Sequence, residues 1–301
     1  MLKQAENRVK IEGILSEIDL DSKPFMKNGK EVEAMGGSII VKVTQKISGK
    51  EKELMIPVYM FAAKLTNAGK PNPAYESIKT VKETFRSIAS TGDEDAADRI
   101  RITGASVRMN EYYAADGHLV SFPRIHASFV NKIPKADCKP EATFALQFVV
   151  GDAMDEIKND EPTGRYMIKG ILPQYGGKVD VIPLFAESDG VISAVSTYWN
   201  KGDTVKANGR LDFSSTTEVT YEEVDFGEPI EKVRTINKSD LIITGGNQEP
   251  IEGEFAFAAA DIQVALTERK ERLEAQKEKD MSRMASKQTP PKSGTGFDLG
   301  F

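Results

Sequence analysis

The sequence has few of the residues that most catalytic and metal sites need. Its 301 residues include one cysteine, two histidines and one tryptophan. A lone Cys138 excludes an internal disulfide and a zinc site built from cysteines. His118 and His126 form no His-Glu-x-x-His motif, and no phosphate loop of the Gly-x-x-x-x-Gly-Lys-Ser/Thr type occurs. We therefore expect a protein that is not an enzyme and that needs no cofactor and no metal.

Long apolar stretches are also missing. No run of about 18 apolar residues occurs, which is the length that a membrane-spanning helix requires. The first residues, Met1 to Glu6, lack the apolar core of a signal peptide. These two absences predict a cytoplasmic protein with no membrane partner.

The sequence does contain one motif that occurs twice. Residues 53–62 read ELMIPVYMFA, and residues 179–186 read VDVIPLFA, so Pro57 matches Pro183. Each copy follows a strand and a glycine-bearing turn, and each is followed by a helical stretch and further strands. This order is typical of the OB-fold, a five-stranded barrel that binds single-stranded nucleic acid or oligosaccharide. We predict a mainly β chain with two tandem OB-fold barrels at residues 1–135 and 141–250, a helix at 254–286 and a disordered tail at 287–301.

The local patterns give boundaries within the two units. Residues 8–18 alternate as a strand with Val9, Ile11 and Leu15 on one face. Residues 22–37 are expected to form a long loop, and residues 73–90 a helix. In the second unit, residues 218–226 are expected to close the barrel, and residues 233–243 to add a further arm. Gly104 and Gly209 occupy matching places and are expected to mark bends in the fourth strands.

Charge is unevenly distributed along the chain. Residues 1–135 hold 21 basic and 17 acidic side chains, whereas residues 136–253 hold 11 basic and 21 acidic ones. Backbone phosphates are bound by Lys and Arg. The first unit is therefore predicted to be the main nucleic-acid-binding domain, and the second is acidic.

Candidate binding residues follow from strand alternation. If Ile56, Val58 and Met60 face the core, then Tyr59 and Phe61 face outward. In the same way, Phe122, Arg124 and His126 share one face of a strand, with Ile125, Ala127 and Phe129 on the other. Bases stack on flat side chains, at about 1 to 3 kcal/mol per base. The predicted nucleic-acid-binding residues are Lys42, Lys46, Tyr59, Phe61, Arg101, Arg108, Tyr112, Tyr113, Phe122, Arg124 and His126 in the first unit, and Lys169, Tyr175, Phe185, Lys206 and Arg210 in the second. Any one of these aromatic residues is equally consistent with core packing, and Trp199 is expected to be core.

The last residues follow a spacer rich in Pro and Gly and read Phe297-Asp298-Leu299-Gly300-Phe301. Tandem OB units with such a tail resemble the single-stranded DNA-binding proteins of bacteria and their phages, over essentially the whole chain. The resemblance implies a protein that coats single-stranded DNA with little sequence preference during DNA replication, recombination or repair, in a bacterial or phage-infected cell. It also implies that Phe297, Asp298, Leu299 and Phe301 bind replication or recombination proteins.

Two other functions stay open at this point. The acidic second unit is compatible with a protein-interaction scaffold or adaptor. A metal-dependent nuclease would need carboxylates such as Glu51, Glu53, Asp152, Asp155 and Glu156 to gather. The polar helix at 254–286 is expected to be solvated or self-associating.

Overall fold

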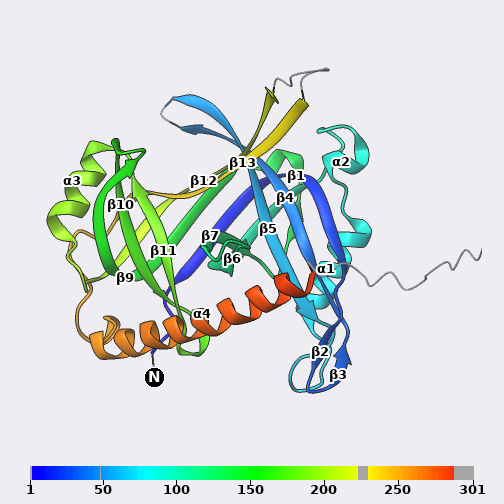
Figure 1. Ribbon diagram of the computed structural model, residues 1–301. Coiled ribbons are helices and arrows are strands. Elements are labelled where there is room, and N and C mark those ends of the chain that lie inside the picture. The colour runs from blue at the N-terminus through cyan, green and yellow to red at the C-terminus, as the bar shows by residue number, and fades with distance from the viewer. Residues whose placement is uncertain (1, 48, 223–229, 288–301) are drawn as a thin grey trace, which may run out of the picture.

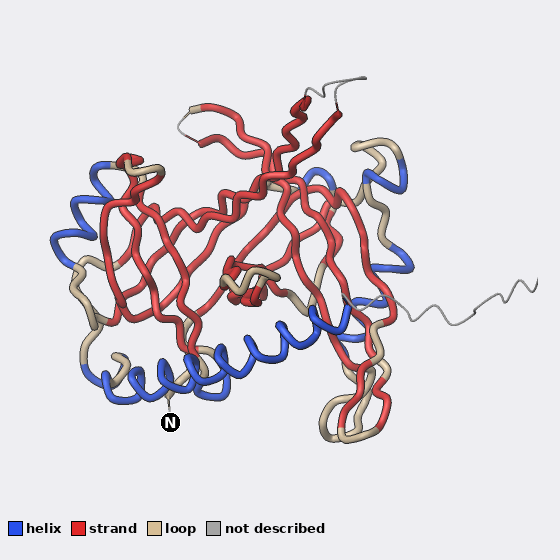
Figure 2. Tube along the Cα trace, viewed as in Figure 1, coloured by secondary structure: helices blue, strands red, loops and turns tan. Residues whose placement is uncertain are grey.

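The chain folds mainly into β-strands and has one long C-terminal helix, as predicted (Figures 1 and 2). The computed structural model describes residues 2–47, 49–222 and 230–287. The strands are β1 (Asn7–Ser22), β2 (Phe25–Lys27), β3 (Lys30–Val32), β4 (Ala34–Ile47), β5 (Lys50–Ala63), β6 (Arg99–Tyr113), β7 (Leu119–His126), β8 (Asn131–Ile133), β9 (Glu141–Lys158), β10 (Glu161–Pro173), β11 (Val179–Ala186), β12 (Thr204–Glu222) and β13 (Ile230–Gly246). The helices are α1 (Pro73–Thr84), α2 (Ile88–Thr91), α3 (Asp189–Tyr198) and α4 (Ala259–Lys287).

Five strands in the first half of the chain close into a circle, which we call the first ring. β1 pairs with β4, β4 with β5, β5 with β7, β7 with β6, and β6 again with β1. Only the pairing of β5 with β7 is parallel. The predicted alternation of β1 is confirmed, because Val9, Ile11 and Leu15 are fully buried. The ring therefore encloses a core built from every second residue of its strands.

Five strands in the second half close in the same order, and we call them the second ring. β9 pairs with β10, β10 with β11, β11 with β13, β13 with β12, and β12 again with β9. The pairing of β11 with β13 is again the parallel one. Helix α3 separates the third and fourth strands of this ring, as α1 and α2 do in the first. Trp199, which follows α3, is buried as predicted.

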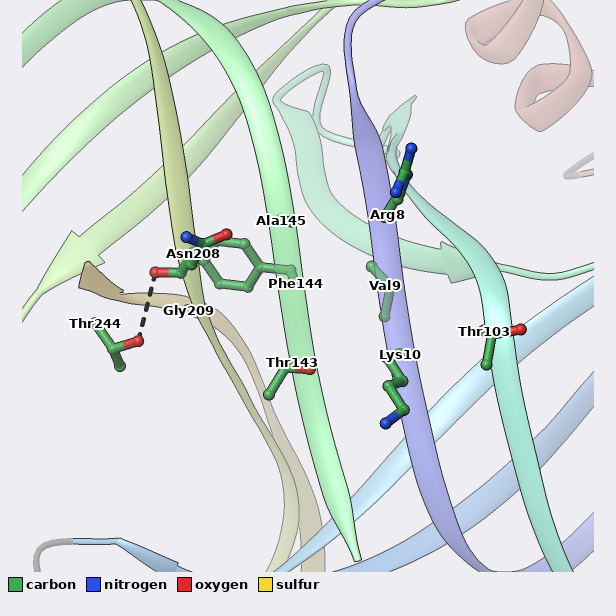
Figure 3. Close-up of a pocket in the computed structure, with 10 residues that line it drawn as sticks. All are labelled: Arg8, Val9, Lys10, Thr103, Thr143, Phe144, Ala145, Asn208, Gly209 and Thr244. Atoms are coloured by element: carbon green, nitrogen blue, oxygen red, sulfur yellow. Dashed lines mark hydrogen bonds between the residues drawn. The ribbon is translucent and has the colours of Figure 1, made fainter. Parts of the chain in front are cut away.

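The two rings share a seam. β1 also pairs antiparallel with β9, from Asn7 opposite Leu146 to Glu12 opposite Glu141. The strands of both rings, together with β8, therefore form one continuous 11-stranded sheet that joins the two predicted units. Gly209 lies near this seam, where a Cβ atom would approach the carbonyl oxygen of Ile242 to 2.1 Å (Figure 3). Strands β12 and β13 shift register at this position, and only glycine fits there.

Gly104 also lies at a register shift. It falls between Ile102 and Ala105, which pair with Ile11 and Val9 of β1. No atom would crowd a Cβ at Gly104. The two glycines thus share a position beside the seam, but only Gly209 is required by close contact.

The expected loop at residues 22–37 is instead a short hairpin of β2 and β3 followed by the start of β4. Asn28 and Gly29 form its turn, with φ angles of 51° and 74°. Two successive positive φ angles are the signature of a tight two-residue hairpin turn, for which Asn-Gly is the preferred pair. The Asn-Gly pair was therefore a hairpin signal.

The helix expected at 73–90 is also different, because it ends at Thr84. Phe85 adopts an extended backbone, with φ of −87° and ψ of 149°. Ser87 then begins α2 through a capping box with Ser90. Phe129 was expected to share one strand face with Ile125 and Ala127, and this is wrong, because β7 ends at His126 and Phe129 is 54% exposed.

The fifth strand of the second ring was assigned wrongly. Residues 218–222 extend β12, and the strand that closes the ring is β13, which contains the supposed extra arm at 233–243. Residues 223–226 lie outside the described residues. The sequence here offers two alternating stretches in succession, so periodicity alone did not decide which of them closes the ring.

Helix α4 crosses both rings along one side of the molecule (Figure 1). Its first turns pack Ile262 and Ala265 against Val149, Ile171 and Val179 of the second ring. Its later turns contact β6: the Gln276 amide donates to the Glu111 carbonyl oxygen at 2.8 Å, and Asp280 accepts from the Tyr113 backbone N–H at 3.1 Å. The helix therefore belongs to the folded body and is not the solvated element that was expected.

Candidate nucleic-acid interface

A cavity of 790 Å³ lies between the two rings, and we call it the inter-ring groove. The first ring contributes the outer faces of β4, β5, β6 and β7, and the second contributes β11, β12 and β13. The residues that line it are Ser38, Ile40, Met55, Pro57, Tyr59, Tyr112, Ser121, Phe122, Pro123, Arg124, Pro183, Phe185, Phe213, Ser214, Lys238, Ser239 and Asp240. The groove is thus a shared surface that neither ring forms alone.

The repeated sequence motif meets itself in this groove. Pro57 and Tyr59 enter from β5, and Pro183 and Phe185 enter from β11. Alternation places them there, because the intervening Val58 and Leu184 are fully buried. The two copies of the motif therefore serve the same surface from opposite sides.

Each copy presents an aromatic ring beneath a guanidinium group. The Arg124 guanidinium carbon lies 4.3 Å from the centre of the Tyr59 ring and 5.2 Å from that of Phe122. The Arg165 guanidinium carbon lies 4.1 Å from the centre of the Phe185 ring. These distances are within the range of cation–π attraction. Flat side chains and cations are therefore held together at two places along the groove.

The first ring places two arginines, Arg108 and Arg124, on one face beside the groove. Arg124 of β7 lies directly opposite Arg108 of β6, so the two side chains share one face of the sheet. Within the described ranges, neither side chain forms an ion pair, and the Arg124 Nε atom is buried without a hydrogen-bond partner. The pKa of the neighbouring His126 is lowered to about 4, first by burial and then by Arg108 and Arg124. Among the described residues, no carboxylate lies within ion-pair distance of these two arginines, so the face has an excess of positive charge.

The second-ring cations beside the groove are held in ion pairs. Arg165 bonds Glu156 and Asp240, each at 2.7 Å. Lys238 bonds Asp212 at 2.7 Å and lies 3.4 Å from Asp240. Arg210 pairs with Glu187 and Asp212, and Lys52 of β5 pairs with the same Asp212 across the boundary between the rings. The pKa of Glu156 falls to about 2, chiefly because Arg165 donates hydrogen bonds to it.

The structure gathers five of the sequence-predicted residues in the groove: Tyr59, Tyr112, Phe122, Arg124 and Phe185. His126 adjoins them, with its ring 5.9 Å from that of Tyr59. Arg108 and Tyr175 line a neighbouring cavity. The alternation that turned Tyr59 outward and buried Ile56, Val58 and Met60 is confirmed by their exposure.

The other predicted residues lie elsewhere. Phe61 is 56% exposed and stacks near Phe25, and Tyr113 lies beneath Lys277 of α4. The remaining cations are ion-paired or line other surfaces: Lys42 with Glu53 and Glu94, Arg101 with Glu12, Lys206 with Glu6, Arg210 with Glu187, Lys169 at 3.9 Å from Asp152, and Lys46 in a cavity beside Arg210. The tail residues Phe297, Asp298, Leu299 and Phe301 lie outside the described residues.

Sequence reasoning missed the groove residues Lys238 and Asp240, and it missed Arg165, which lies over the ring of the groove residue Phe185. Arg165 begins the stretch 165–172 that was assigned as a strand, and its alternation with the buried Ile168 could have suggested an outward position. Lys238 and Asp240 were hidden because β13 had been taken for an extra arm. The shared groove itself had no sequence signal, since it depends on how the two rings pack.

A second cavity, of 450 Å³, lies at the seam between β1 and β9 (Figure 3). It is lined by Arg8 and Lys10 of β1 and by Thr143 of β9, with Asn208 nearby. Lys10 forms an ion pair with Glu141, and Arg8 lies 3.6 Å from Glu6. It contains no aromatic side chain except the buried Phe144, so it offers no stacking surface.

Two further searches concern only the part of the chain that the structure describes. Within it, no three His, Cys, Asp or Glu residues are grouped so that they could hold a metal ion. No helix in the same ranges has the length and apolar character needed to cross a membrane.

Comparison with known proteins shows the family to which the chain belongs. The YorF family model matches residues 5–279, which include both rings and most of α4. The chain belongs to the YorF family. None of the curated proteins matches this YorF sequence.

The YorF chain is similar in fold to two crystal structures of the single-stranded DNA binding protein from Thermus aquaticus, one wild-type and one a deletion mutant. The wild-type structure is 12% identical, with a TM-score of 0.50, and the alignment covers 83% of this chain and 96% of that one. The deletion mutant gives 12% identity, a TM-score of 0.50, and coverage of 83% and 97%. At this identity the likeness concerns the fold alone.

Proposed function

We propose that the protein binds single-stranded DNA in the inter-ring groove. One observation carries this proposal: both copies of the repeated motif face the same groove, each with an aromatic ring beneath an arginine. Aromatic faces bind bases by stacking, and arginines bind phosphates and also stack. The Arg108 and Arg124 pair adds positive charge that a phosphate would neutralise.

The groove suits a single strand better than a duplex. Tyr59 and Phe122 can stack only on bases whose faces are free, and a duplex conceals these faces. Every base has such a face, so stacking discriminates weakly between sequences. The protein therefore binds single strands with little sequence preference, without catalysis.

We further propose that each ring is an OB-fold. The strand order within each ring, the parallel pairing that closes it, and the helix before the fourth strand all agree with that fold. The fold likeness to a single-stranded DNA binding protein supports the same assignment. The first ring is the main DNA-binding domain, because its groove residue Arg124 and the neighbouring Arg108 form no ion pair within the described residues.

A role in replication, recombination or repair follows as a further proposal. In this role, Phe297, Asp298, Leu299 and Phe301 bind the partner proteins. Deletion of residues 297–301 should leave DNA affinity unchanged while removing replication or recombination proteins from material purified with the full chain. Identical partners for both forms would contradict the role of the tail.

The DNA proposal is tested by fluorescence titration with single-stranded and duplex oligonucleotides at two salt concentrations. Tight, salt-sensitive binding is expected only for the single strand. Tyr59→Ala and Phe122→Ala should each weaken it by about 1 to 3 kcal/mol, or roughly 5- to 150-fold.

Phe61→Ala provides a matched control. Phe61 lies on the same strand as Tyr59 and is exposed, yet it is outside the groove. Its loss should change the affinity less than twofold. Equal losses for Tyr59→Ala and Phe61→Ala would place the DNA elsewhere, and the absence of any preference for single strands would overturn the function.

A further inference from the structure

A further cavity, distinct from the one at the seam of β1 and β9, lies beside the inter-ring groove, where the two rings meet α4. Its volume is 330 Å³. Arg108 reaches it from β6 of the first ring, Lys178 from the start of β11 in the second, and Arg272 from α4. We call it the junction cavity. Three parts of the chain that are far apart in sequence thus each place one cation at the same site.

The junction cavity has more positive than negative charge. Its one carboxylate belongs to Asp180, whose Oδ2 atom accepts hydrogen bonds from the Met109 backbone N–H at 3.2 Å and from the Gln174 amide at 3.0 Å. In the ranges 2–47, 49–222 and 230–287, no carboxylate lies within ion-pair distance of Arg108, Lys178 or Arg272. Such an arrangement can accept an anion.

Neighbouring cations of α4 behave differently. Arg269 pairs with Glu111, and Lys270 lies 4.0 Å from Glu274. Arg272 follows them on the same helix but projects into the junction cavity. Within the described residues Arg272 forms no ion pair, although its charge opposes the rise that burial causes in the pKa of Asp180, which lines the same cavity.

The junction cavity also continues the cationic face of the groove. Arg108 lines the cavity and lies directly opposite Arg124, which lines the groove. Like charges directly opposite each other on a sheet destabilise it. An anion bound along this face would reduce the repulsion between Arg108 and Arg124. Tyr175, 84% exposed in the turn between β10 and β11, stands at the edge of the cavity and can stack on a base there.

We propose that the junction cavity binds a backbone phosphate of the single strand where the strand leaves the inter-ring groove, and that Arg272 makes α4 part of the DNA interface. This inference rests on the proposed function. A free phosphate ion has the same chemistry as the backbone phosphate, so the experiment must separate the two.

The test uses the full chain and a fluorescent single-stranded oligonucleotide long enough to extend beyond one ring. Arg272→Ala should weaken binding at least threefold, and the slope of log affinity against log salt should become shallower by about 0.7, as the loss of one phosphate contact requires. Lys270→Ala removes the same charge from the same helix, and it should change the affinity less than twofold and leave the slope unaltered.

Lys178→Ala gives an independent variant on an exposed strand end, with the same expected losses as Arg272→Ala. Thermal unfolding of each variant checks that the fold is kept, and if one variant fails to fold the other decides. In a separate arm, 10 mM inorganic phosphate is compared with chloride at equal ionic strength. Competition by phosphate in the wild type but not in Arg272→Ala supports the site.

The experiment distinguishes failure of the proposed function from failure of the junction site. If the wild type does not prefer single strands, the proposed function fails and the junction site fails with it. If the wild type binds but Arg272→Ala and Lys178→Ala match Lys270→Ala, the junction site alone is wrong. If phosphate competes but the oligonucleotide affinity is insensitive to all three variants, the cavity binds free phosphate rather than DNA, and the proposal is overturned.

Discussion

The two walls of the inter-ring groove carry the same motif in different electrostatic surroundings. Beside Tyr59 of the first ring, Arg124 and Arg108 face each other without acidic partners in the described chain. Beside Phe185 of the second ring, Arg165 is held by Glu156 and Asp240. We therefore expect a similar stack of arginine on an aromatic ring to have a binding role on one wall and a structural role on the other.

The largest expected effect separates these two roles through stability. Arg165→Ala would leave Glu156 and Asp240 without their buried partner, and loss of one member of a buried ion pair costs about 3 to 5 kcal/mol. Urea unfolding should show this loss, whereas Arg124→Ala should lower the unfolding free energy by less than about 1 kcal/mol. Equal losses for the two variants would remove the distinction between the walls.

The reverse ranking is expected for DNA binding. Arg124→Ala removes a cation that the proposed function assigns to phosphate binding, together with its contacts with two aromatic rings, so the affinity should fall about tenfold. The salt dependence should become shallower by about 0.7. Titration of folded Arg124→Ala at several salt concentrations measures both changes. Unchanged affinity would show that the unpaired arginines are not part of the interface.

A smaller effect should follow when the second wall is made more like the first. Asp240→Asn removes a groove carboxylate that holds Arg165 and Lys238. DNA affinity at low salt should rise about threefold, and the gain should vanish at high salt. Asp152→Asn is the control, because Asp152 is in the same ring but outside the groove. A rise for both variants would reflect net charge alone.

A further expected effect concerns pH. The pKa of His126 is lowered from 6.5 to about 4, mainly by burial, with Arg108 and Arg124 adding repulsion. The unfolded chain therefore takes up this proton first, so the stability contributed by neutral His126 is complete above about pH 6.5 and is lost as the pH falls toward 4. His126→Gln should reduce the drop in melting temperature between pH 7.5 and pH 5. If the melting temperature of His126→Gln falls as much as that of the wild type, other titratable groups cause the pH dependence.

Local periodicity predicted much of the fold, and long-range pairing decided the rest. Strict alternation identified the buried Val9, Ile11 and Leu15, and turned Tyr59 outward. The same rule could not show that Arg101 would be bound by Glu12, or Arg210 by Glu187, because these partners come from other strands. The cations that looked suited to phosphate were therefore often ion-paired, and the free ones were recognisable only in three dimensions.

The strand β1 also limits experiments on isolated halves. It pairs with β4 and β6 in its own ring and with β9 of the other. A fragment of residues 1–135 would expose the edge that β9 covers, and exposed edges promote association. The ranking of the two rings in DNA binding is therefore better tested by point variants in the whole chain than by fragments.

The antiparallel pairing of β1 with β9 sets equivalent strands of two similar rings side by side, in the manner of two identical subunits about a twofold axis. Two identical subunits would offer a polynucleotide two equivalent directions of travel. Here both rings lie in one polypeptide, and the charged side chains of the two rings differ. The 5′ and 3′ ends of a bound strand would therefore meet different surroundings. We expect a strand in the inter-ring groove to lie with one polarity, which end-labelled oligonucleotides can reveal.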